Sequence, residues 1–445
     1  MNILLAIHHF PPSYSAGAEL YTYRLALWLV AHGHTVQVVC IETLADDQAA
    51  GVRAEYEVYQ GIPVWRLHLG LRGAHPEWPY KNPMVAAWLA EHLCSERPDL
   101  LHLHSGYLIG AGVLEVAHAH ALPSMVTLHD YWFLCPRITL LRGDDEVCHA
   151  IPENPAGCAW CLRLEQRRHR LPDRWSHGAA GWAWMALASR PEAGQQAARR
   201  AYVQQTLRLA QMAIAPSRFL AGRFAGLIDP ERLRVVRLGM DAQGLSNAAP
   251  PFTSPTLRLA YIGQIAPHKG VHVLIEALQR LPQSGRPLSL ALHGGLTSFP
   301  AYVRQLKAQI RNDPRITLAG PFSSDQAATV LGAADVVVVP SIWYENSPLV
   351  ILEAHASGRP VITSALGGMA ELVHNEVDGL HFRPGDAGDL ARQIERLRND
   401  PALLNHLQAG IRPAVSVDQE MRQLMGLYEQ VVQRGFDRLS QRRGG

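Results

Sequence analysis

The sequence predicts an α/β protein made of two facing, doubly wound Rossmann-like domains with an active-site cleft between them. Short apolar runs, rich in leucine or β-branched residues, alternate along the chain with helical stretches. The hydrophobicity of these runs is continuous rather than alternating, which is typical of strands buried on both faces of a parallel sheet. The runs fall into two similar sets, and consecutive βα units build one doubly wound sheet from each set.

The first domain is predicted to span residues 1–238. Helices are expected between its strands, for example at residues 18–31 and 84–96. Ligands of open α/β sheets bind at the carboxyl ends of the strands, which is why the site is expected in the cleft. The strands are expected at residues 2–7, 35–40, 64–69, 99–104, 124–129 and 212–217.

The second domain is predicted over residues 239–417 and repeats this pattern. A proline-containing stretch at 239–255 breaks any helix and marks the connection between the domains. Residues 418–445 are predicted to form a terminal helix that packs back toward the first domain. The strands of the second set are expected at residues 257–263, 288–294, 315–320, 335–341 and 360–365.

Composition excludes several classes of protein. The 445 residues are 48% hydrophobic and 18% charged, which excludes disorder as the main state. A net charge of +2 gives no basic field for general nucleic-acid binding, so no nucleic-acid partner is expected. No apolar run reaches the ~18–20 residues of a spanning helix, and MNILLAIHHFPP lacks a basic signal-peptide region. We therefore expect a soluble cytoplasmic protein.

Residues 162–208 form a predicted insertion that is both basic and aromatic. The segment contains nine arginines against three acidic residues, together with Trp175, Trp182 and Trp184. Arginine combined with tryptophan suits the headgroup region of an anionic membrane. We expect the insertion to touch the inner face of the cell membrane peripherally. The alternative is a solvated basic insertion whose tryptophans pack on the domain.

Four of the six cysteines cluster in a loop rich in proline and glycine, residues 135–161. Four thiolates complete a tetrahedral shell around a metal, and a reducing cytoplasm favours metal binding over disulfides. We expect a structural zinc site or, alternatively, an iron–sulfur cluster; free thiols are the third possibility. Cys40 and Cys94 are expected to be buried and inert. The pattern C-x12-C-x9-C-x2-C is formed by Cys135, Cys148, Cys158 and Cys161.

The most informative stretch covers residues 340–372. A buried strand leads into a helix that is expected to begin at Ser347 and Pro348, with the serine as N-cap. The free backbone N–H groups at such a helix start form an anion site suited to a pyrophosphate. Glu345 precedes the helix and Glu353 lies in its second turn. A carboxylate accepts hydrogen bonds from two hydroxyls, so these two residues are candidates for holding two diols.

This stretch resembles the retaining glycosyltransferases of the GT-B fold, glycosyltransferase family 4. The resemblance rests on the E-x7-E pattern, on the N-S-P-L sequence that it encloses, and on a later G-G-x-x-E at Gly367, Gly368 and Glu371. It spans nearly all of residues 1–415. Four more segments resemble family motifs in the family's order, namely PPSYSAGAEL with Gly17, VTLHDYW with His129, IAPSRF with Ser217, and YIGQIAPHKG with Lys269.

One position departs from the family pattern. The family usually has arginine directly after the glycine of the lysine motif, whereas this chain has Gln264. His268 and Arg218 are candidates for supplying the missing charge. Lys269 itself is one of only three lysines beside 38 arginines, and a compact ammonium suits a leaving phosphate.

The resemblance implies a role for each motif residue. Glu353 is expected to hold the ribose diol and Glu345 a hydroxyl of the transferred sugar, while His129 contacts that sugar or stabilises charge near its anomeric carbon. Lys269 and Gln264 take the diphosphate, and Gly17 lets the backbone approach the donor. The catalytic residues are then His129, Lys269 and Glu345. The donor-binding residues are Gly17, Gln264, Lys269, Asn346, Ser347, Pro348, Leu349 and Glu353.

The implied reaction is transfer of a hexosyl group from a nucleotide diphosphate sugar to an acceptor hydroxyl, with retention. The expected acceptor is a glycan or lipid-linked glycan of polysaccharide or glycolipid biosynthesis, with residues 162–208 on the acceptor side. No D-x-D motif is present, so no catalytic cofactor is expected. A nucleotide-sugar epimerase and a non-catalytic sugar-nucleotide or metal sensor are the alternatives. No G-x-G-x-x-G opens the first βα unit and no P-loop motif occurs, which argues against dehydrogenases and P-loop kinases.

Overall fold

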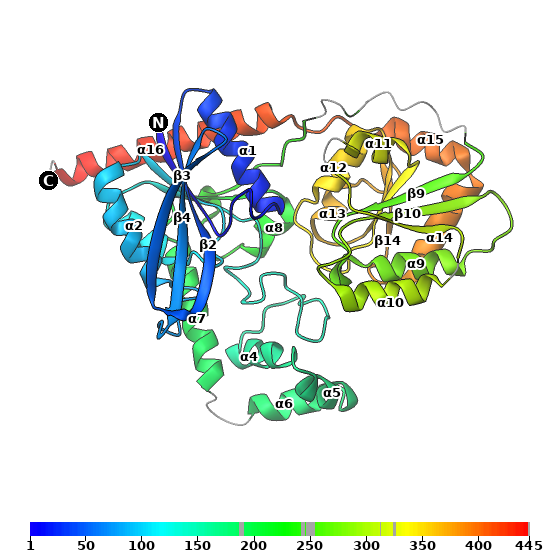
Figure 1. Ribbon diagram of the computed structural model, residues 1–445, viewed down its shortest axis with the longest axis horizontal. Helices are drawn as coiled ribbons and strands as arrows, with labels where there is room; N and C mark the ends of the chain where they lie inside the picture. Colours follow the sequence, from blue (N-terminus) through cyan, green and yellow to red (C-terminus); the bar gives the residue numbers. More distant parts are fainter. Residues whose placement is uncertain (187–190, 242–244, 246–253, 312, 324–325, 444–445) are drawn as a thin grey trace. The chain divides into compact units, whose positions relative to one another are not determined.

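The computed structural model describes residues 1–186, 191–241, 245, 254–311, 313–323 and 326–443. The chain divides into two compact units (Figure 1). The N-terminal unit comprises residues 1–216, 220–236 and 421–445, and the C-terminal unit comprises residues 217–219 and 237–420. Each unit is an α/β domain around its own sheet, so the prediction of two doubly wound Rossmann-like domains is confirmed.

The N-terminal unit contains an eight-stranded sheet with the strand order β3-β4-β2-β1-β5-β6-β7-β8. All neighbouring strands are parallel except the edge pair β3 and β4. The central strands β1, β5, β6 and β7 are buried almost throughout, which explains their continuous hydrophobicity. The strands are β1 (Asn2–Ile7), β2 (Thr35–Ala49), β3 (Gly51–Tyr59), β4 (Ile62–Arg72), β5 (Leu100–Leu103), β6 (Ser124–Thr127), β7 (Met212–Ala215) and β8 (Leu233–Val235).

The sheet edge differs from the sequence prediction. Strand β2 continues to Ala49, and β3 pairs with β4 in an antiparallel hairpin that the sequence analysis did not predict. Every residue of β3 is exposed or half-exposed, and this edge strand pairs only with β4. A polar edge strand lacks the continuous run of apolar residues by which a buried strand is recognised. The sequence criterion therefore does not detect it.

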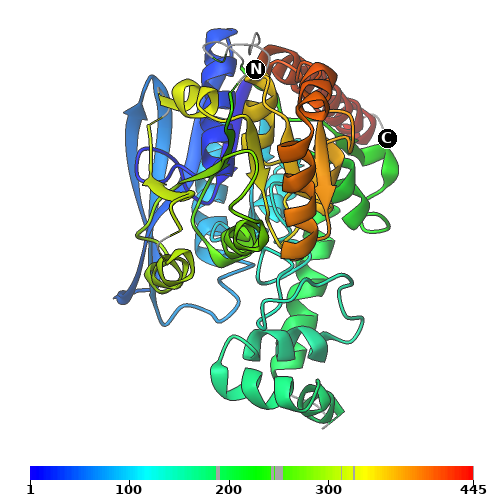
Figure 2. The ribbon, with the colours of Figure 1, turned by 90° about the vertical axis from the view of Figure 1, so that its right-hand side faces the viewer.

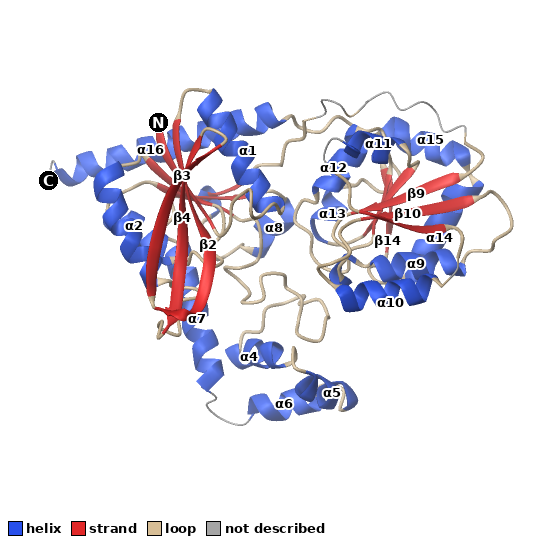
Figure 3. Ribbon diagram, viewed as in Figure 1, coloured by secondary structure: helices blue, strands red, loops and turns tan. Residues whose placement is uncertain are grey.

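Helices surround the sheet of the N-terminal unit (Figure 3). Residues Val417–Glu420 of the long helix α16 belong to the C-terminal unit, and the remainder of that helix belongs to the N-terminal unit. In the described part of the chain, no helix is long and apolar enough to cross a membrane. The first two residues of α8 likewise belong to the C-terminal unit. The helices are α1 (Gly17–Ala31), α2 (Pro83–Glu96), α3 (Gly112–Ala119), α7 (Pro191–Leu207), α8 (Arg218–Arg223), the short 3-10 helix η1 (Pro230–Arg232) and α16 (Val417–Arg443).

Three further helices project away from the sheet of the N-terminal unit, as Figures 1 and 2 both show. They are α4 (Pro155–Arg163), α5 (Arg167–Trp175) and α6 (Ala179–Ala186). The prediction of a loop over 135–161 is therefore wrong from residue 155 onward. Pro155 occupies the first turn of α4, and the side chain of Asn154 accepts a hydrogen bond from the N–H of Ala156. The proline and the N-cap favour the start of a helix here. The glycine and the clustered cysteines of the same segment suggest a loop instead, which explains the wrong prediction.

The C-terminal unit contains a six-stranded parallel sheet with the order β11-β10-β9-β12-β13-β14. Val336 and Val338 of β12 belong to one hydrophobic cluster, and Val337 and Val339 to another, so the sheet is covered on both faces. The strands are β9 (Leu257–Ile262), β10 (Leu288–His293), β11 (Ile316–Gly320), β12 (Val336–Val339), β13 (Val361–Ser364) and β14 (Gly379–Phe382). The helices are η2 (Pro267–Lys269), α9 (Val271–Arg280), α10 (Pro300–Ile310), α11 (Ala327–Gly332), α12 (Leu349–Ala356), α13 (Gly367–Leu372), α14 (Ala387–Asn399) and α15 (Pro401–Gly410).

Candidate active site

Lys269 and Glu345 meet beyond the carboxyl ends of β9 and β12 in the C-terminal unit. These neighbouring strands are parallel, so the segments that follow them emerge at the same edge of the sheet. The Nζ atom of Lys269 lies 2.6 Å from Oε1 of Glu345. Two candidate residues 76 positions apart in sequence thus form one ion pair.

Glu345 is held by three donors. Its Oε1 atom accepts hydrogen bonds from Nζ of Lys269, from Oγ of Ser341 at 2.9 Å and from Nε1 of Trp343 at 2.8 Å. The residue is only 7% exposed. Burial alone raises the pKa of a carboxyl, but the Lys269 charge and these hydrogen bonds together lower the pKa of Glu345 below its usual value. Glu345 is therefore an ionised, oriented acceptor at neutral pH.

Lys269 also faces an aromatic ring. Its partly buried ammonium lies 5.3 Å from the ring centroid of Trp343, close enough for a cation–π contact. Burial, reinforced by the Lys269 charge, lowers the pKa of the adjacent His268 to about 4. His268 is therefore neutral at neutral pH. It does not supply the charge that Gln264 lacks.

Glycines allow the loops of this site to pack closely. A Cβ atom on Gly270, which has φ +69°, meets the Pro340 carbonyl oxygen at 1.9 Å. A Cβ atom on Gly368 meets the Asn346 carbonyl oxygen at 1.8 Å, and the Gly368 N–H donates to the Glu345 carbonyl at 2.7 Å. The glycines of the lysine motif and of G-G-x-x-E therefore hold the backbone around Glu345 in place.

Glu371, the last residue of the G-G-x-x-E motif, anchors another part of the same unit. Its carboxylate accepts hydrogen bonds from the backbone N–H groups of Arg218 and Phe219 at 3.1 and 3.0 Å. It also forms an ion pair with Arg237 at 2.7 Å. The exposed Arg218 thus contributes its backbone to Glu371, beside the Ser217 of the IAPSRF motif.

Helix α12 begins at Leu349, and its N-cap is Pro348 rather than the predicted Ser347. The extended conformation of Pro348 (φ −67°, ψ 118°) starts the helix one residue later than the predicted cap allows. The hydroxyl of Ser347 is buried and makes no hydrogen bond within the described residues. The prediction of a serine N-cap is therefore wrong. In the first turn the Ile351 N–H donates to the Pro348 carbonyl at 3.1 Å, whereas the Leu349 and Val350 N–H groups have no acceptor one turn earlier in the helix, as at any helix start.

Glu353 differs from Glu345 in having no fixed partner. It is partly buried in α12, and burial raises the pKa of its carboxyl above the usual value. Among the described residues, nothing donates a hydrogen bond or forms an ion pair to its carboxylate. Partial burial of a carboxylate without hydrogen-bond donors costs free energy, and a ligand that supplies the donors removes this cost.

Gln264 directly follows Gly263, the first residue after β9. Its backbone carbonyl accepts a hydrogen bond from the Tyr261 hydroxyl at 2.7 Å, while its side chain is exposed. The loop carbonyl is therefore fixed and the amide group is able to turn toward a ligand.

In the N-terminal unit, histidines gather beyond the carboxyl ends of β1, β5 and β6. His129 is partly exposed; its Nε2 lies 3.1 Å from Nδ1 of His104, and its ring packs edge-on against Tyr21 at 4.9 Å. His8 lies 3.1 Å from Glu19, a buried residue in the first turn of α1. Gly17, the first residue of that helix, is exposed, with open space around its Cβ position.

The protein surroundings lower the pKa of two histidines at this end of the sheet, His129 and His102. Desolvation, reinforced by His8 and opposed by Glu19, lowers the pKa of His129 to about 3. Burial lowers the pKa of His102 to about 3 as well, and His102 lies 2.8 Å from Oγ1 of Thr127 and 2.6 Å from the Tyr428 hydroxyl. At neutral pH His129 is therefore a neutral hydrogen-bonding group rather than a cation.

We expect the N-terminal unit to lose stability as the pH falls below about 6.5. When the pKa of a histidine is lowered by folding, the unfolded chain takes up a proton at a higher pH than the folded chain does. Acidification therefore favours the unfolded state. With a folded pKa of about 3, His102 should lower the free energy of unfolding by about 2 kcal/mol between pH 7 and pH 5. Hydrogen exchange of β1 and β5 measures this loss. His102→Gln should show a smaller loss, and an equal pH dependence contradicts the prediction.

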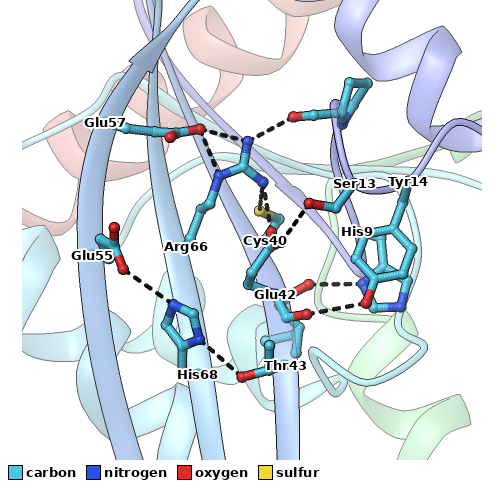
Figure 4. A network of polar contacts seen from close by, with 12 residues as sticks. His9, Ser13, Tyr14, Cys40, Glu42, Thr43, Glu55, Glu57, Arg66 and His68 are labelled. Atoms are coloured by element: carbon cyan, nitrogen blue, oxygen red, sulfur yellow. Dashed lines mark hydrogen bonds and ion pairs between the residues drawn. The ribbon is translucent and has the colours of Figure 1, made fainter.

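Arg66, which the sequence analysis did not single out, anchors the loop between β1 and α1 (Figure 4). Its buried guanidinium donates to the Pro11 carbonyl at 2.6 Å and to Glu42 at 2.7 Å, and pairs with Glu57 at 2.6 Å. The loop makes further contacts with β2, including Ser13 Oγ to Glu42 at 2.6 Å. A charged residue within an otherwise apolar predicted strand was the signal for this role.

The four clustered cysteines surround one cavity in the N-terminal unit. The cavity has a volume of about 260 Å³, and none of the four forms a disulfide. Within the described residues, no three histidine, cysteine or acidic side chains converge on a single metal ion. Burial raises the pKa of the Cys40 thiol to about 12, consistent with an inert residue, whereas Cys94 is exposed and not buried as predicted.

Models of known families match both halves of the chain. The model described as Glycosyltransferase Family 4 matches residues 15–243, and the one described as Glycosyl transferases group 1 matches residues 248–412. The glycogen synthase of Mycobacterium tuberculosis (strain ATCC 25618 / H37Rv) is 26% identical over 437 residues, which cover 94% of this chain and 91% of that protein. A D-inositol 3-phosphate glycosyltransferase from Mycolicibacterium vanbaalenii is 29% identical over 315 residues, covering 66% of this chain and 64% of that protein.

Solved structures of similar fold cover nearly the whole chain. Sucrose-phosphate synthase from Thermosynechococcus elongatus has a TM-score of 0.65 at 21% identity, covering 97% of this chain and 99% of that one. Anabaena HepE in complex with UDP has a TM-score of 0.63 at 19% identity, covering 97% and 100% of the two chains. At these identities the likeness concerns the fold.

Proposed function

This chain belongs to glycosyltransferase family 4, and on that premise we propose that it transfers a hexosyl group from a nucleotide diphosphate sugar to an acceptor hydroxyl with retention of configuration. The Lys269–Glu345 pair carries the proposal. It places a cation and an oriented carboxylate together at the carboxyl edge of a parallel sheet, where such folds bind nucleotides. Relatives of similar fold include proteins solved with UDP and with UDP-glucose.

Each group of the C-terminal unit then has a defined task. Lys269 and the first-turn N–H groups of α12 bind the diphosphate and stabilise the negative charge that grows on it as the glycosidic bond breaks. Glu345 accepts a hydrogen bond from a hydroxyl of the transferred sugar. Glu353, whose carboxylate lacks a donor within the described residues, accepts from the ribose hydroxyls. No residue of this set requires a divalent cation, and we propose that catalysis is metal-independent.

In the N-terminal unit we assign His129 to the sugar. A neutral imidazole hydrogen-bonds a hydroxyl without adding a positive charge next to the electron-poor anomeric carbon. Arg66 donates to the Pro11 carbonyl and so fixes the loop that leads to Gly17 at the start of α1.

A donor screen followed by product analysis tests the function. Nucleotide sugars are first ranked by thermal stabilisation of the full chain, and the best donor is then incubated with candidate glycans and lipid-linked glycans. We expect transfer with the donor's anomeric configuration preserved in the product, as read by NMR. An inverted product overturns retention. Isomerisation of the donor alone points to an epimerase, and binding without turnover points to a sensor.

Gln264→Arg is expected to be tolerated, or to tighten donor binding by up to about fivefold, because an exposed added charge contributes about 0–1 kcal/mol. The exposed Gln264 side chain leaves space for the substitution. Calorimetric titration with the donor measures the effect, and Gln305→Arg on the exposed face of α10 is the matched control. Loss of activity in Gln264→Arg alone would mean that the glutamine has a specific role.

We also propose that helices α5 and α6 bind an anionic membrane surface. Trp175 and Trp182 are 78% and 72% exposed, so these two tryptophans do not pack on the domain. Trp184, by contrast, packs on Trp160 and under Arg163. Arginines of α5 accompany the exposed rings, and this combination of charge and aromatic surface matches lipid headgroups. A lipid-linked glycan is then the favoured acceptor, and the protein is peripheral on the inner face of the cell membrane.

Replacing both exposed tryptophans should weaken membrane binding. Burying one large apolar side chain contributes about 1.5–3 kcal/mol, so we expect Trp175→Ala/Trp182→Ala to lower binding to anionic liposomes by at least about tenfold. Flotation at low and high salt measures it, and salt should weaken binding of the unmodified chain. The control is Tyr56→Ala on β3, a residue that is 52% exposed. Failure of the unmodified chain to float at low salt rejects the membrane assignment.

A further inference from the structure

The four cysteines around the 260 Å³ cavity come from two separate pieces of backbone. Cys158 and Cys161 lie one turn apart on α4, so they occupy the same face of that helix. Cys135 and Cys148 flank a tight hairpin in which Leu141 bridges Val147 and the Cys148 N–H donates to the Leu140 carbonyl at 2.8 Å. The fold thus brings a pair of thiols from the hairpin and a pair from the helix to one space.

Two of the four sulfurs take part in hydrogen bonds. The Cys148 thiol donates to the Ala150 carbonyl at 3.3 Å, a bond that this thiol gives up when it loses its proton to become a metal ligand. The Arg200 guanidinium donates to the Cys158 sulfur at 3.2 Å. Hydrogen bonds to sulfur of this kind support and tune thiolate ligands of metals.

The remaining lining of the cavity is mainly apolar, and the backbone around it is packed without space to spare. Leu140 and Leu141 of the hairpin are buried there. A Cβ atom on Gly143, at the tip of the hairpin, meets the Cys161 carbonyl oxygen at 2.3 Å. The hairpin tip is therefore seated against α4, and the four partly exposed thiols line one preformed space between the hairpin and the helix.

We propose that Cys135, Cys148, Cys158 and Cys161 hold a thiophilic metal centre that ties the hairpin to helix α4. Four thiolates are the ligand set of structural zinc and of iron–sulfur clusters. The centre is structural: it stabilises the segment that follows His129, and the proposed sugar transfer takes no step through it. This inference is independent of the proposed donor site in the C-terminal unit.

The two kinds of centre make different demands on the side chains. A tetrahedral zinc with bonds of about 2.3 Å requires the sulfurs to approach within about 3.8 Å of one another. The described side chains do not converge on one ion, so zinc requires the thiols to rotate inward. The thiolates that hold an iron–sulfur cluster lie farther apart than those around one zinc ion, so we expect the cavity of about 260 Å³ to accommodate a cluster with less movement of the thiols.

Metal analysis of the full-length protein, purified anaerobically without chelator, tests the proposal. We expect one centre per chain, recognised as iron with acid-labile sulfide and visible absorption if it is a cluster, or as zinc without either if it is a single ion. Cys158→Ser/Cys161→Ser should lose the metal, and Cys94→Ser, which removes the exposed cysteine outside the cavity, should retain it. Absence of stoichiometric metal, or its retention in the double variant, overturns the proposal.

Thiol labelling of the unmodified protein keeps the test decisive if the double variant does not fold. We expect a thiol reagent to modify Cys94 at once and to reach the four cavity cysteines only after a strong chelator has removed the metal. The same treatment should make residues 135–161 more sensitive to limited proteolysis while donor-induced thermal stabilisation persists. Equal labelling of the four thiols with and without chelator overturns the metal centre, and so does recovery of disulfides among them.

Discussion

Lys269→Ala is expected to lower turnover by roughly 100-fold or more, with a smaller effect on donor affinity. The ammonium is the one side-chain cation paired with Glu345 in the described site, and charge stabilisation of a leaving group is worth the most in the transition state. Only one of its three N–H donors is needed for Glu345, which leaves the others for a diphosphate. Steady-state and single-turnover rates with the donor found by the screen measure the effect.

Two controls separate chemistry from folding. Lys307→Ala removes an exposed lysine of α10 and should leave the rate unchanged. Removing Lys269 also deprives the buried Glu345 of its ion-pair partner, so a loss of thermal stability is expected beside the loss of rate. Lys269→Arg keeps the positive charge, so its thermal stability should be closer to that of the unmodified protein than its turnover is. The larger, planar guanidinium does not reproduce the contacts of the compact ammonium. Unchanged turnover in a folded Lys269→Ala protein rejects the assigned role.

The structure adds a feature to the expected roles of this pair. The sequence motifs assign Lys269 to the diphosphate and Glu345 to the sugar, as two separate contacts. The three hydrogen bonds to Oε1 of Glu345 instead couple the residues through one atom, with Trp343 touching both. Binding of a diphosphate at Lys269 and of a sugar hydroxyl at Glu345 should therefore be cooperative, since each contact changes the partner's electrostatic environment.

The central parts of both sheets could be predicted from the sequence. Continuous apolar runs reveal strands covered on both faces, such as β1 and β12. The same signal does not reveal β3, because all its side chains are exposed or half-exposed and several of them are charged. It also missed α4, whose starting signals, Asn154 and Pro155, lie inside a stretch read as a loop.

The sequence predicts which residues belong to the candidate site, but it does not predict how they contact one another. Motifs placed Lys269, Glu345 and Glu353 in one domain, yet the sharing of Oε1 among Lys269, Ser341 and Trp343 depends on loop geometry. The Ser347 cap was mispredicted because Pro348 takes an extended conformation before the helix. The neutral state of His129 follows from desolvation, which sequence alone does not report.

Glu353→Gln is expected to weaken donor binding by about 1–3 kcal/mol, or about 5- to 150-fold in Kd. The amide still accepts a hydrogen bond from a ribose hydroxyl, but it lacks the charge that makes the carboxylate a strong acceptor in a partly buried site. Calorimetric titration with the nucleotide sugar and with the free nucleoside diphosphate should show similar losses, because the ribose is common to both. Glu276→Gln, an exposed glutamate of α9, is the matched control.

The pH dependence of donor binding gives Glu353 a second, independent test. Burial raises the pKa of this carboxyl, so it becomes protonated at a higher pH than an ordinary glutamate as the solution is acidified. Donor affinity of the unmodified chain should therefore begin to fall above the usual glutamate range, and the Glu353→Gln variant should lack that part of the dependence. The pKa of Glu345 is lowered instead, so its contribution persists to lower pH. If both proteins show the same pH profile and the same affinity, the ribose contact belongs to another residue.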